Sequence, residues 1–111
     1  MLKNKIALIT GGGRGIGAGI AKEIAAQGAV VIINYSHSEE AAKQVQSEIR
    51  AAGGRAEVFC CDVSDYNSVK AMTGDIIKHY GRLDILVNNA GIVKDSLLMR
   101  MKETDFNKVI D

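Results

Sequence analysis

The chain contains no proline and no tryptophan, only two cysteines, and just 5% aromatic residues among its 111 positions. It has no proline-rich linker, low-complexity segment or internal repeat that would mark a domain boundary, so we expect one domain over residues 1–111. Cys60 and Cys61 are adjacent, and neighbours in a strand point to opposite faces, which disfavours a disulfide between them. No C-x-x-C pattern is present either. We therefore expect no metal site and two buried thiols at the end of a strand.

Neither sign of charge predominates, because 14 basic and 13 acidic residues are interspersed and give a net charge of +1. That balance leaves no basic stripe for nucleic acid and no polybasic tail for a membrane. The apolar run Ile6–Ile9 ends at a glycine cluster and is too short for the core of a signal peptide. With 47% hydrophobic and 24% charged residues, the composition predicts a soluble, cytoplasmic protein without nucleic-acid or membrane partners.

Short apolar segments recur along the chain and are nearly continuous rather than alternating. Such segments are typical of strands that are buried on both faces of a parallel sheet. The four predicted strands cover Ile6–Ile9, Val30–Ile33, Val58–Cys60 and Leu83–Val87.

Three helical patterns separate these strands. The second begins at Ser38 and the third at Ser64 or Asp65, all of which are residue types that cap helix N-termini. Glycines follow the three patterns at Gly28, Gly53 and Gly81, as at many helix ends. The side chains expected to face the sheet are Ile16, Ile20 and Ile24 in the first, Ala42, Val45 and Ile49 in the second, and Val69, Met72 and Ile76 in the third.

This alternation predicts an α/β fold, a Rossmann-like doubly wound parallel sheet with right-handed crossovers. Beyond the fourth strand, Phe106, Val109 and Ile110 suggest a helix that begins near Lys102 and stops at Asp111 without a cap. We expect the fold to be truncated after the fourth strand and the start of this helix. The fourth strand would then be an apolar edge, a feature that invites aggregation.

The first predicted strand leads directly into TGGGRGIG, which has five glycines in eight residues. Glycines permit a sharp turn and let a pyrophosphate approach the N–H groups at the positive end of the next helix. Two registers compete: G-x-G-x-x-A from Gly13 to Ala18, and T-G-x-x-x-G-x-G from Thr10 to Gly17. We favour the second because Gly11 then follows the strand directly, where the tight turn is needed. The lysine of a nucleoside triphosphate loop is absent.

The end of the second strand bears on the choice of dinucleotide. A cofactor with a free ribose 2′-OH usually meets an Asp or Glu about 20 residues beyond the glycines. This chain has Asn34–His37 there and no carboxylate before Glu39. Arg14 could pair with a 2′-phosphate and Ser36 could donate to it. NADPH or NADP is therefore expected rather than NAD. His37 could also bind the 2′-phosphate when protonated, although an ordinary surface histidine is the favoured interpretation.

Polar residues also follow the third and fourth strands. Asp62 could accept a hydrogen bond from an adenine amino group, the Val63 amide could donate to the ring, and Asn88–Gly91 is expected to form a second polar turn. Each feature alone is also typical of an ordinary turn. Because the carboxyl ends of parallel strands share one edge, their coincidence with the glycine loop indicates a single binding crevice.

The motifs TGGGRGIG, CDV at 61–63 and LVNNAG at 86–91 resemble the cofactor-binding signatures of the classical short-chain dehydrogenases/reductases. More narrowly, VNNAGIVKDSLLMRM resembles the bacterial 3-oxoacyl-[acyl-carrier-protein] reductases, which reduce a β-keto thioester with NADPH. The likeness covers the whole chain and implies that Asn88 also steadies the strands through backbone hydrogen bonds. The cofactor contacts that it implies are Gly11, Gly12, Gly13, Arg14, Ile16, Ser36, Asp62, Val63, Asn88, Ala90 and Gly91.

Tyr66 and Lys70 have the Y-x-x-x-K spacing of the family's catalytic pair, but they precede the NNAG turn, whereas that pair follows it in the family. We therefore expect no catalytic residue in this chain. The resemblance implies the N-terminal part of an NADPH-dependent reductase of acyl-carrier-protein thioesters, which is a homotetramer when complete and inactive as this part alone. The alternatives are another short-chain alcohol dehydrogenase, an acetoacetyl-CoA reductase, or a non-catalytic dinucleotide-binding module.

Overall fold

The computed structural model describes residues 2–13, 15–89 and 109–110, whose strands form one parallel sheet in the order β3-β2-β1-β4-β5. Parallel pairing extends over every neighbouring pair of strands. Helices alternate with the first four strands, as the sequence predicts. The elements are β1 (Ile6–Thr10), α1 (Gly15–Ala26), β2 (Val30–Tyr35), α2 (Glu39–Ala51), β3 (Arg55–Cys60), α3 (Tyr66–Tyr80), β4 (Ile85–Asn88) and β5 (Val109–Ile110).

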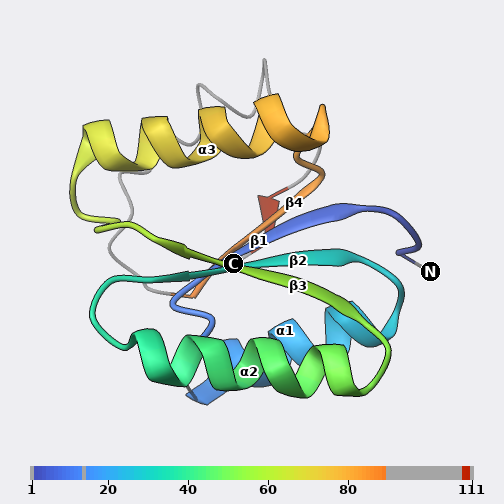
Figure 1. Ribbon diagram of the computed structural model, residues 1–111. Coiled ribbons are helices and arrows are strands. Elements are labelled where there is room, and N and C mark those ends of the chain that lie inside the picture. Colours follow the sequence, from blue (N-terminus) through green and yellow to red (C-terminus); the bar gives the residue numbers. More distant parts are fainter. Residues whose placement is uncertain (1, 14, 90–108, 111) are drawn as a thin grey trace.

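The sheet is covered on both faces, with α1 and α2 on one side and α3 on the other (Figure 1). Alternation along the strands divides the core accordingly. In β1, Ile6 and Leu8 pack with residues of α3, whereas Ala7 and Ile9 pack with residues of α1 and α2. Because both faces are covered, no polar alternation appears along β1, which explains its continuous apolar run. None of the described helices is long and apolar enough to span a membrane.

Helices α2 and α3 have the buried faces that the sequence predicts. Asp65 caps α3, and its side chain accepts a hydrogen bond from the Asn67 backbone N–H. Gly81 ends this helix at a φ of 82°, which favours glycine, and donates to the Ile77 carbonyl at 2.7 Å. Ser38 occupies the N-cap of α2 but makes no side-chain capping hydrogen bond.

The predicted buried face of α1 is confirmed at Ile24 and wrong at Ile16. The helix buries Gly17, Ala21, Ile24 and Ala25, whereas Ile16 is 77% exposed and Ile20 is only half-buried. Small residues face the sheet because α1 lies very close to the neighbouring strand ends. A Cβ atom on Gly17 would lie 2.5 Å from both the Gly11 carbonyl oxygen and the Asn89 amide nitrogen.

Strand β3 forms one edge of the sheet and begins at Arg55, three residues before the predicted start at Val58. The additional residues include charged side chains that are paired at the surface. Arg55 donates to Asn4 Oδ1 at 2.8 Å, and Glu57 accepts from Arg50 at 3.0 Å. An apolar run reveals only the covered part of such an edge strand, and charges here also discourage pairing with another chain.

At the other edge of the sheet, the prediction of a helix at Val109 and Ile110 is wrong. These two residues form β5, which pairs with Leu86 and Val87 of β4, so β4 is not a free edge at these positions. The backbone N–H and C=O groups of β4 need partners, and β-branched residues suit an extended strand. The rest of the predicted helix, 102–108, lies outside the described residues.

Candidate functional site

The carboxyl ends of the parallel strands meet at one edge of the sheet. The strand order places β2 and β3 on one side of β1 and β4 on the other, so the chain reverses its direction of winding between β1 and β4. Ligands of open α/β sheets bind at such a switch point. The segments found there are Gly11–Gly13 after β1, Ser36–Ser38 after β2, Asp62–Val63 after β3 and Asn88–Asn89 at the end of β4.

The glycine loop turns sharply between β1 and α1. Gly11 has a φ of 63°, a left-handed conformation that favours glycine. Gly13 lies against α2, where an added Cβ atom would be 3.0 Å from the Ala42 backbone nitrogen. The loop therefore brings backbone directly to the N-terminal end of α1, where free N–H groups and the helix dipole favour an anion. Arg14 lies outside the described residues.

Asn34, at the end of β2, holds the glycine loop in place. Its side chain is 2% exposed. Oδ1 accepts from the Gly11 backbone N–H at 3.2 Å, and Nδ2 donates to the Cys61 carbonyl at 3.0 Å. The Asn34 carbonyl accepts from Gly12 N–H at 3.2 Å. The Asn34 side chain therefore points inward and joins the ends of β1, β2 and β3. Its position directly after the apolar run Val30–Ile33 was the signal in the sequence that could have identified a buried structural amide.

We expect Asn34→Leu to lower the free energy of unfolding by about 1–2 kcal/mol, because a backbone donor and a backbone acceptor lose their partner. Urea denaturation followed by circular dichroism measures this change. Asn67→Leu is the matched control, since Asn67 is exposed on α3 and its replacement should shift stability by no more than about 0.5 kcal/mol. Equal midpoints for the two variants would show that Asn34 does not hold the loop.

The end of β4 contacts the glycine loop through two asparagines. Asn88 pairs with Thr10 in the strand register, and its Oδ1 accepts from Thr10 Oγ1 at 3.4 Å. Asn89 Nδ2 donates to the Gly11 carbonyl at 3.2 Å. The sequence predicted Asn88 as the steadying residue and missed Asn89, although the doubled asparagine was visible. Residues 90 and 91, predicted as cofactor contacts, lie outside the described residues.

Asp62 follows β3 and is exposed. Its Oδ1 accepts from the Ser64 hydroxyl at 2.6 Å and from the Ser64 backbone N–H at 3.0 Å. These hydrogen bonds, with a smaller contribution from the nearby charge of His37, lower the pKa of Asp62. The carboxylate is therefore ionised at neutral pH and acts only as an acceptor. Val63 is half-buried and packs against the core beneath α3.

The two cysteines do not share one environment. Cys61 is 5% exposed, and burial raises the pKa of its thiol. Cys60 is exposed, so the prediction that both thiols are buried is wrong. Alternation at the end of an edge strand turns one of two neighbouring side chains outward. The Cys60 Sγ lies 4.0 Å from the Ser36 carbonyl oxygen, beside the segment that follows β2.

Parts of the glycine loop and the end of β2 line a pocket of about 130 Å³. Ile16 is exposed at the start of α1, close in sequence to this loop. Tyr66 and Lys70 belong to α3, on the opposite face of the sheet from α1 and α2 (Figure 1). No cluster of metal-ligating side chains occurs within the part of the chain that the structure describes. The described lining residues of the pocket are Gly11, Gly13, Asn34, Tyr35, Ser36, His37 and Ser38, none of them a carboxylate.

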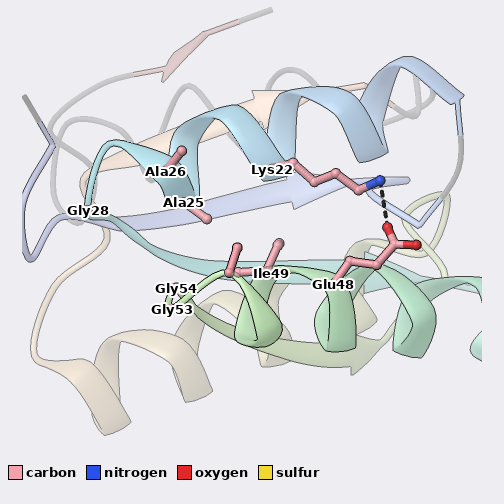
Figure 2. A pocket seen from close by; sticks show the side chains of 9 residues that line it. Lys22, Ala25, Ala26, Gly28, Glu48, Ile49, Gly53 and Gly54 are labelled. Carbon is pink, nitrogen blue, oxygen red and sulfur yellow. Dashed lines mark ion pairs between the residues drawn. The ribbon is translucent and has the colours of Figure 1, made fainter.

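A larger pocket, of about 400 Å³, lies between the C-terminal parts of α1 and α2 (Figure 2). Ala25, Ala26 and Ile49 contribute apolar surface, and Lys22 pairs with Glu48 at 2.6 Å at one side. None of the predicted cofactor contacts lines this pocket. The smaller pocket at the strand ends is therefore the candidate site.

Comparison with known proteins points to one family. The short chain dehydrogenase family model matches residues 5–111. The chain is 47% identical over 111 residues to the 3-oxoacyl-[acyl-carrier-protein] reductase FabG of Staphylococcus aureus strain Mu50, covering 100% of this chain and 45% of that protein. It is 44% identical over 110 residues to the hydroxynaphthalene reductase arp2 of Aspergillus fumigatus, covering 99% and 40% respectively. The chain thus spans less than half the length of these relatives.

Solved structures agree on the fold. A metagenomic short-chain oxidoreductase in complex with NADP matches with a TM-score of 0.78 and 41% identity, over 82% of this chain and 41% of the other. A short chain dehydrogenase from Burkholderia cenocepacia J2315, also in complex with NADP, matches with a TM-score of 0.76 and 49% identity, over 82% and 37%.

Proposed function

The chain belongs to the short-chain dehydrogenase family, and from that membership we propose that it forms the NADP-binding part of a 3-oxoacyl-[acyl-carrier-protein] reductase. The whole enzyme would convert a 3-oxoacyl thioester to the 3-hydroxyacyl form. The observation that carries the cofactor assignment is the pocket after β2, whose described lining offers hydroxyl groups and an imidazole but no carboxylate. A carboxylate there would favour NAD by accepting from the ribose 2′-OH.

The dinucleotide would span the edge of the sheet from the glycine loop to the end of β3. Gly11, Gly12 and Gly13 would lie against the pyrophosphate, which the N-terminal end of α1 would stabilise. Asp62 would accept from the adenine amino group, as its ionised carboxylate allows. The other proposed contacts are Arg14, Ile16, Ser36, Val63, Asn88, Ala90 and Gly91.

When bound, NADPH supplies the hydride for reduction of a carbonyl group. The residues of this chain bind and orient the dinucleotide: Asn34 and Asn89 fix the glycine loop by hydrogen bonds to Gly11. We do not assign proton transfer to Tyr66 and Lys70, because they precede the NNAG turn, whereas the catalytic pair of the resembled family follows it. We propose that the proton donor of the whole enzyme lies in the region that corresponds to the unmatched part of the relatives.

A second candidate is a reductase of aromatic ketones. The identity to the hydroxynaphthalene reductase, 44%, is close to the 47% identity to the acyl-carrier-protein reductase. Both relatives are named as reductases, so the two candidates differ in substrate rather than in the type of reaction. The thioester is favoured by the segment VNNAGIVKDSLLMRM, which resembles the acyl-carrier-protein reductases.

The test is oxidation of NADPH by the intact protein, followed by its absorbance, with acetoacetyl-acyl-carrier protein or a hydroxynaphthalene ketone as substrate. We expect turnover with the thioester and NADPH, and little with NADH. Turnover of the aromatic ketone alone would move the assignment to the second candidate. Absence of NADPH binding would reject both.

A further inference from the structure

A further pocket, of about 420 Å³, lies between strand β3 and the C-terminal part of α3. A cavity of this volume can hold a small organic molecule. None of the contacts proposed for the dinucleotide lines it, and it shares no lining residue with the pocket between α1 and α2. The pocket is therefore separate from both cavities described above.

The floor of this pocket is apolar. It lies on the face of the sheet that α3 covers (Figure 1), where Ile32 of β2 and Ile76 of α3 are 2% and 3% exposed. Phe59, on the edge strand β3, packs against the same group of core residues but is only half-buried. The partly covered edge strand thus leaves apolar surface open to a ligand.

Aromatic side chains form the walls. The rings of His79 and Tyr80 meet edge to face, with centroids 4.6 Å apart and planes at 83°, so their faces point in different directions. Phe59 contributes a third ring from β3. Burial, with a smaller contribution from Glu57, raises the pKa of Tyr80, so its phenol stays neutral at physiological pH. The negative face of a neutral aromatic ring attracts a cation.

The acidic and basic residues around the pocket differ in their access to a ligand. Glu57 and Asp75 line it, whereas no lysine or arginine is among its described lining residues. Asp75 is exposed, and its carboxylate makes no hydrogen bond or ion pair with another described residue. Arg50 and Arg55 are near enough to lower the pKa of Tyr80, but by less than burial raises it. Arg50 is paired with Glu57 at 3.0 Å, and Arg55 donates to the segment before β1.

We propose that this pocket binds a small organic cation, an alkylammonium compound whose apolar part rests on Ile32 and Ile76. Its charged group would lie between the aromatic rings and the Asp75 carboxylate, where both attract it. An anion would meet the unpaired Asp75 carboxylate, and a neutral molecule would gain only the apolar contact. The inference goes beyond the proposed function, because no contact proposed for the dinucleotide lines this pocket.

The experiment compares choline with its neutral analogue 3,3-dimethyl-1-butanol by NMR titration of the intact protein. The two compounds share one shape, but choline has a quaternary nitrogen where the alcohol has a carbon. The titrations are run at about pH 8, where an ordinary histidine is neutral, and at low ionic strength, because salt screens exposed charges. We expect the wild type to bind choline about fivefold more tightly than the alcohol, the size of a cation–aromatic contact at an exposed site.

Two variants test the two sources of attraction. Asp75→Asn should reduce the affinity for choline about threefold and leave the affinity for the alcohol unchanged, because it removes a charge but keeps the shape of the side chain. Since Asp75 is exposed, this variant should fold as the wild type does. Tyr80→Leu should reduce the affinity for choline about fivefold, because leucine keeps apolar contact but has no aromatic face. Thermal unfolding checks that both variants retain the fold.

Glu40→Gln is the matched control, because it removes a carboxylate charge from an exposed position on α2. It should keep the wild-type preference for choline. Equal affinity of the wild type for the two compounds, absence of saturable choline binding, or a preference that is unchanged in both Asp75→Asn and Tyr80→Leu would overturn the inference. NADPH is titrated into the same samples, and failure to bind it would reject the proposed function while leaving the cation site intact.

Discussion

Gly17→Ala is expected to remove dinucleotide binding and to lower the free energy of unfolding by about 3 kcal/mol, the upper part of the range for overpacked sites. The added Cβ atom would lie 2.5 Å from the Gly11 carbonyl oxygen and from Asn89 Nδ2. Those two atoms are joined by the 3.2 Å hydrogen bond that fixes the glycine loop to the end of β4. Relief of the contact must therefore move backbone at the centre of the candidate site.

Gly19→Ala is the control for this prediction. Gly19 lies in the same helix, is exposed, and has no atom within 4 Å of an added Cβ. Alanine there should raise stability by about 0.5–1 kcal/mol through helix propensity and leave NADPH binding unchanged. The two variants are compared by thermal unfolding and by NADPH titration. Close packing of α1 against the loop would be disproved if Gly17→Ala behaved like Gly19→Ala in both measurements.

Asp84→Ala should lower the free energy of unfolding by about 3 kcal/mol without affecting dinucleotide binding in the molecules that remain folded. Asp84 is 3% exposed. Its Oδ2 accepts from the Ile6 backbone N–H at 2.8 Å, and its Oδ1 accepts from Arg82 Nε at 2.7 Å. We expect the lower end of the range for a broken buried ion pair, because Arg82 is 49% exposed and can return to water.

The position of Asp84 explains why only stability should change. Asp84 precedes β4 and accepts a hydrogen bond at the beginning of β1, so it lies at the amino-terminal ends of these strands. The glycine loop lies at their carboxyl ends. Asp75→Ala serves as the control, since Asp75 is exposed on α3 and its loss should change stability by at most about 0.5 kcal/mol. Urea denaturation measures both. A midpoint for Asp84→Ala equal to that of Asp75→Ala would show that the buried carboxylate does not stabilise the sheet.

The sequence predicts best where strong local signals agree. The buried faces of α2 and α3 were predicted correctly because apolar residues recur at helical spacing between clear start and stop residues. The end of α3 at Gly81 follows from a glycine in the left-handed region. The continuous apolar runs likewise predicted a parallel sheet with both faces covered, since each strand alternates between two cores.

Predictions fail where tertiary contacts override local preference. Ile16 of α1 was predicted to be buried together with Ile24, but Ile16 is exposed and Gly17 is buried instead. An added Cβ atom on Gly17 would lie 2.5 Å from the Gly11 carbonyl oxygen, so only glycine permits this close approach. Val109 looked helical from its spacing, yet it pairs with Leu86 of β4, and strand pairing is not visible in local periodicity.

The candidate site shows the same division. Motifs predicted the glycine loop and the segments at the strand ends, because each of these segments is a contiguous run of residues. The roles of Asn34 and Asn89 depend on hydrogen bonds to Gly11 across the fold, over separations of 23 and 78 positions. The proximity of His37 and Asp62 is equally a product of neighbouring strands β2 and β3. No local pattern carries such information.

The most direct test is a calorimetric titration of the intact protein with NADPH and, separately, with NADH. An NADP site at the ends of β1 and β2 predicts saturable binding at one site, with NADPH bound about tenfold more tightly than NADH, as expected for a charge-assisted contact to the 2′-phosphate. Gly17→Ala should abolish the signal for both. Absence of binding to the wild type, or affinity for NADH equal to or higher than that for NADPH, would contradict the assignment.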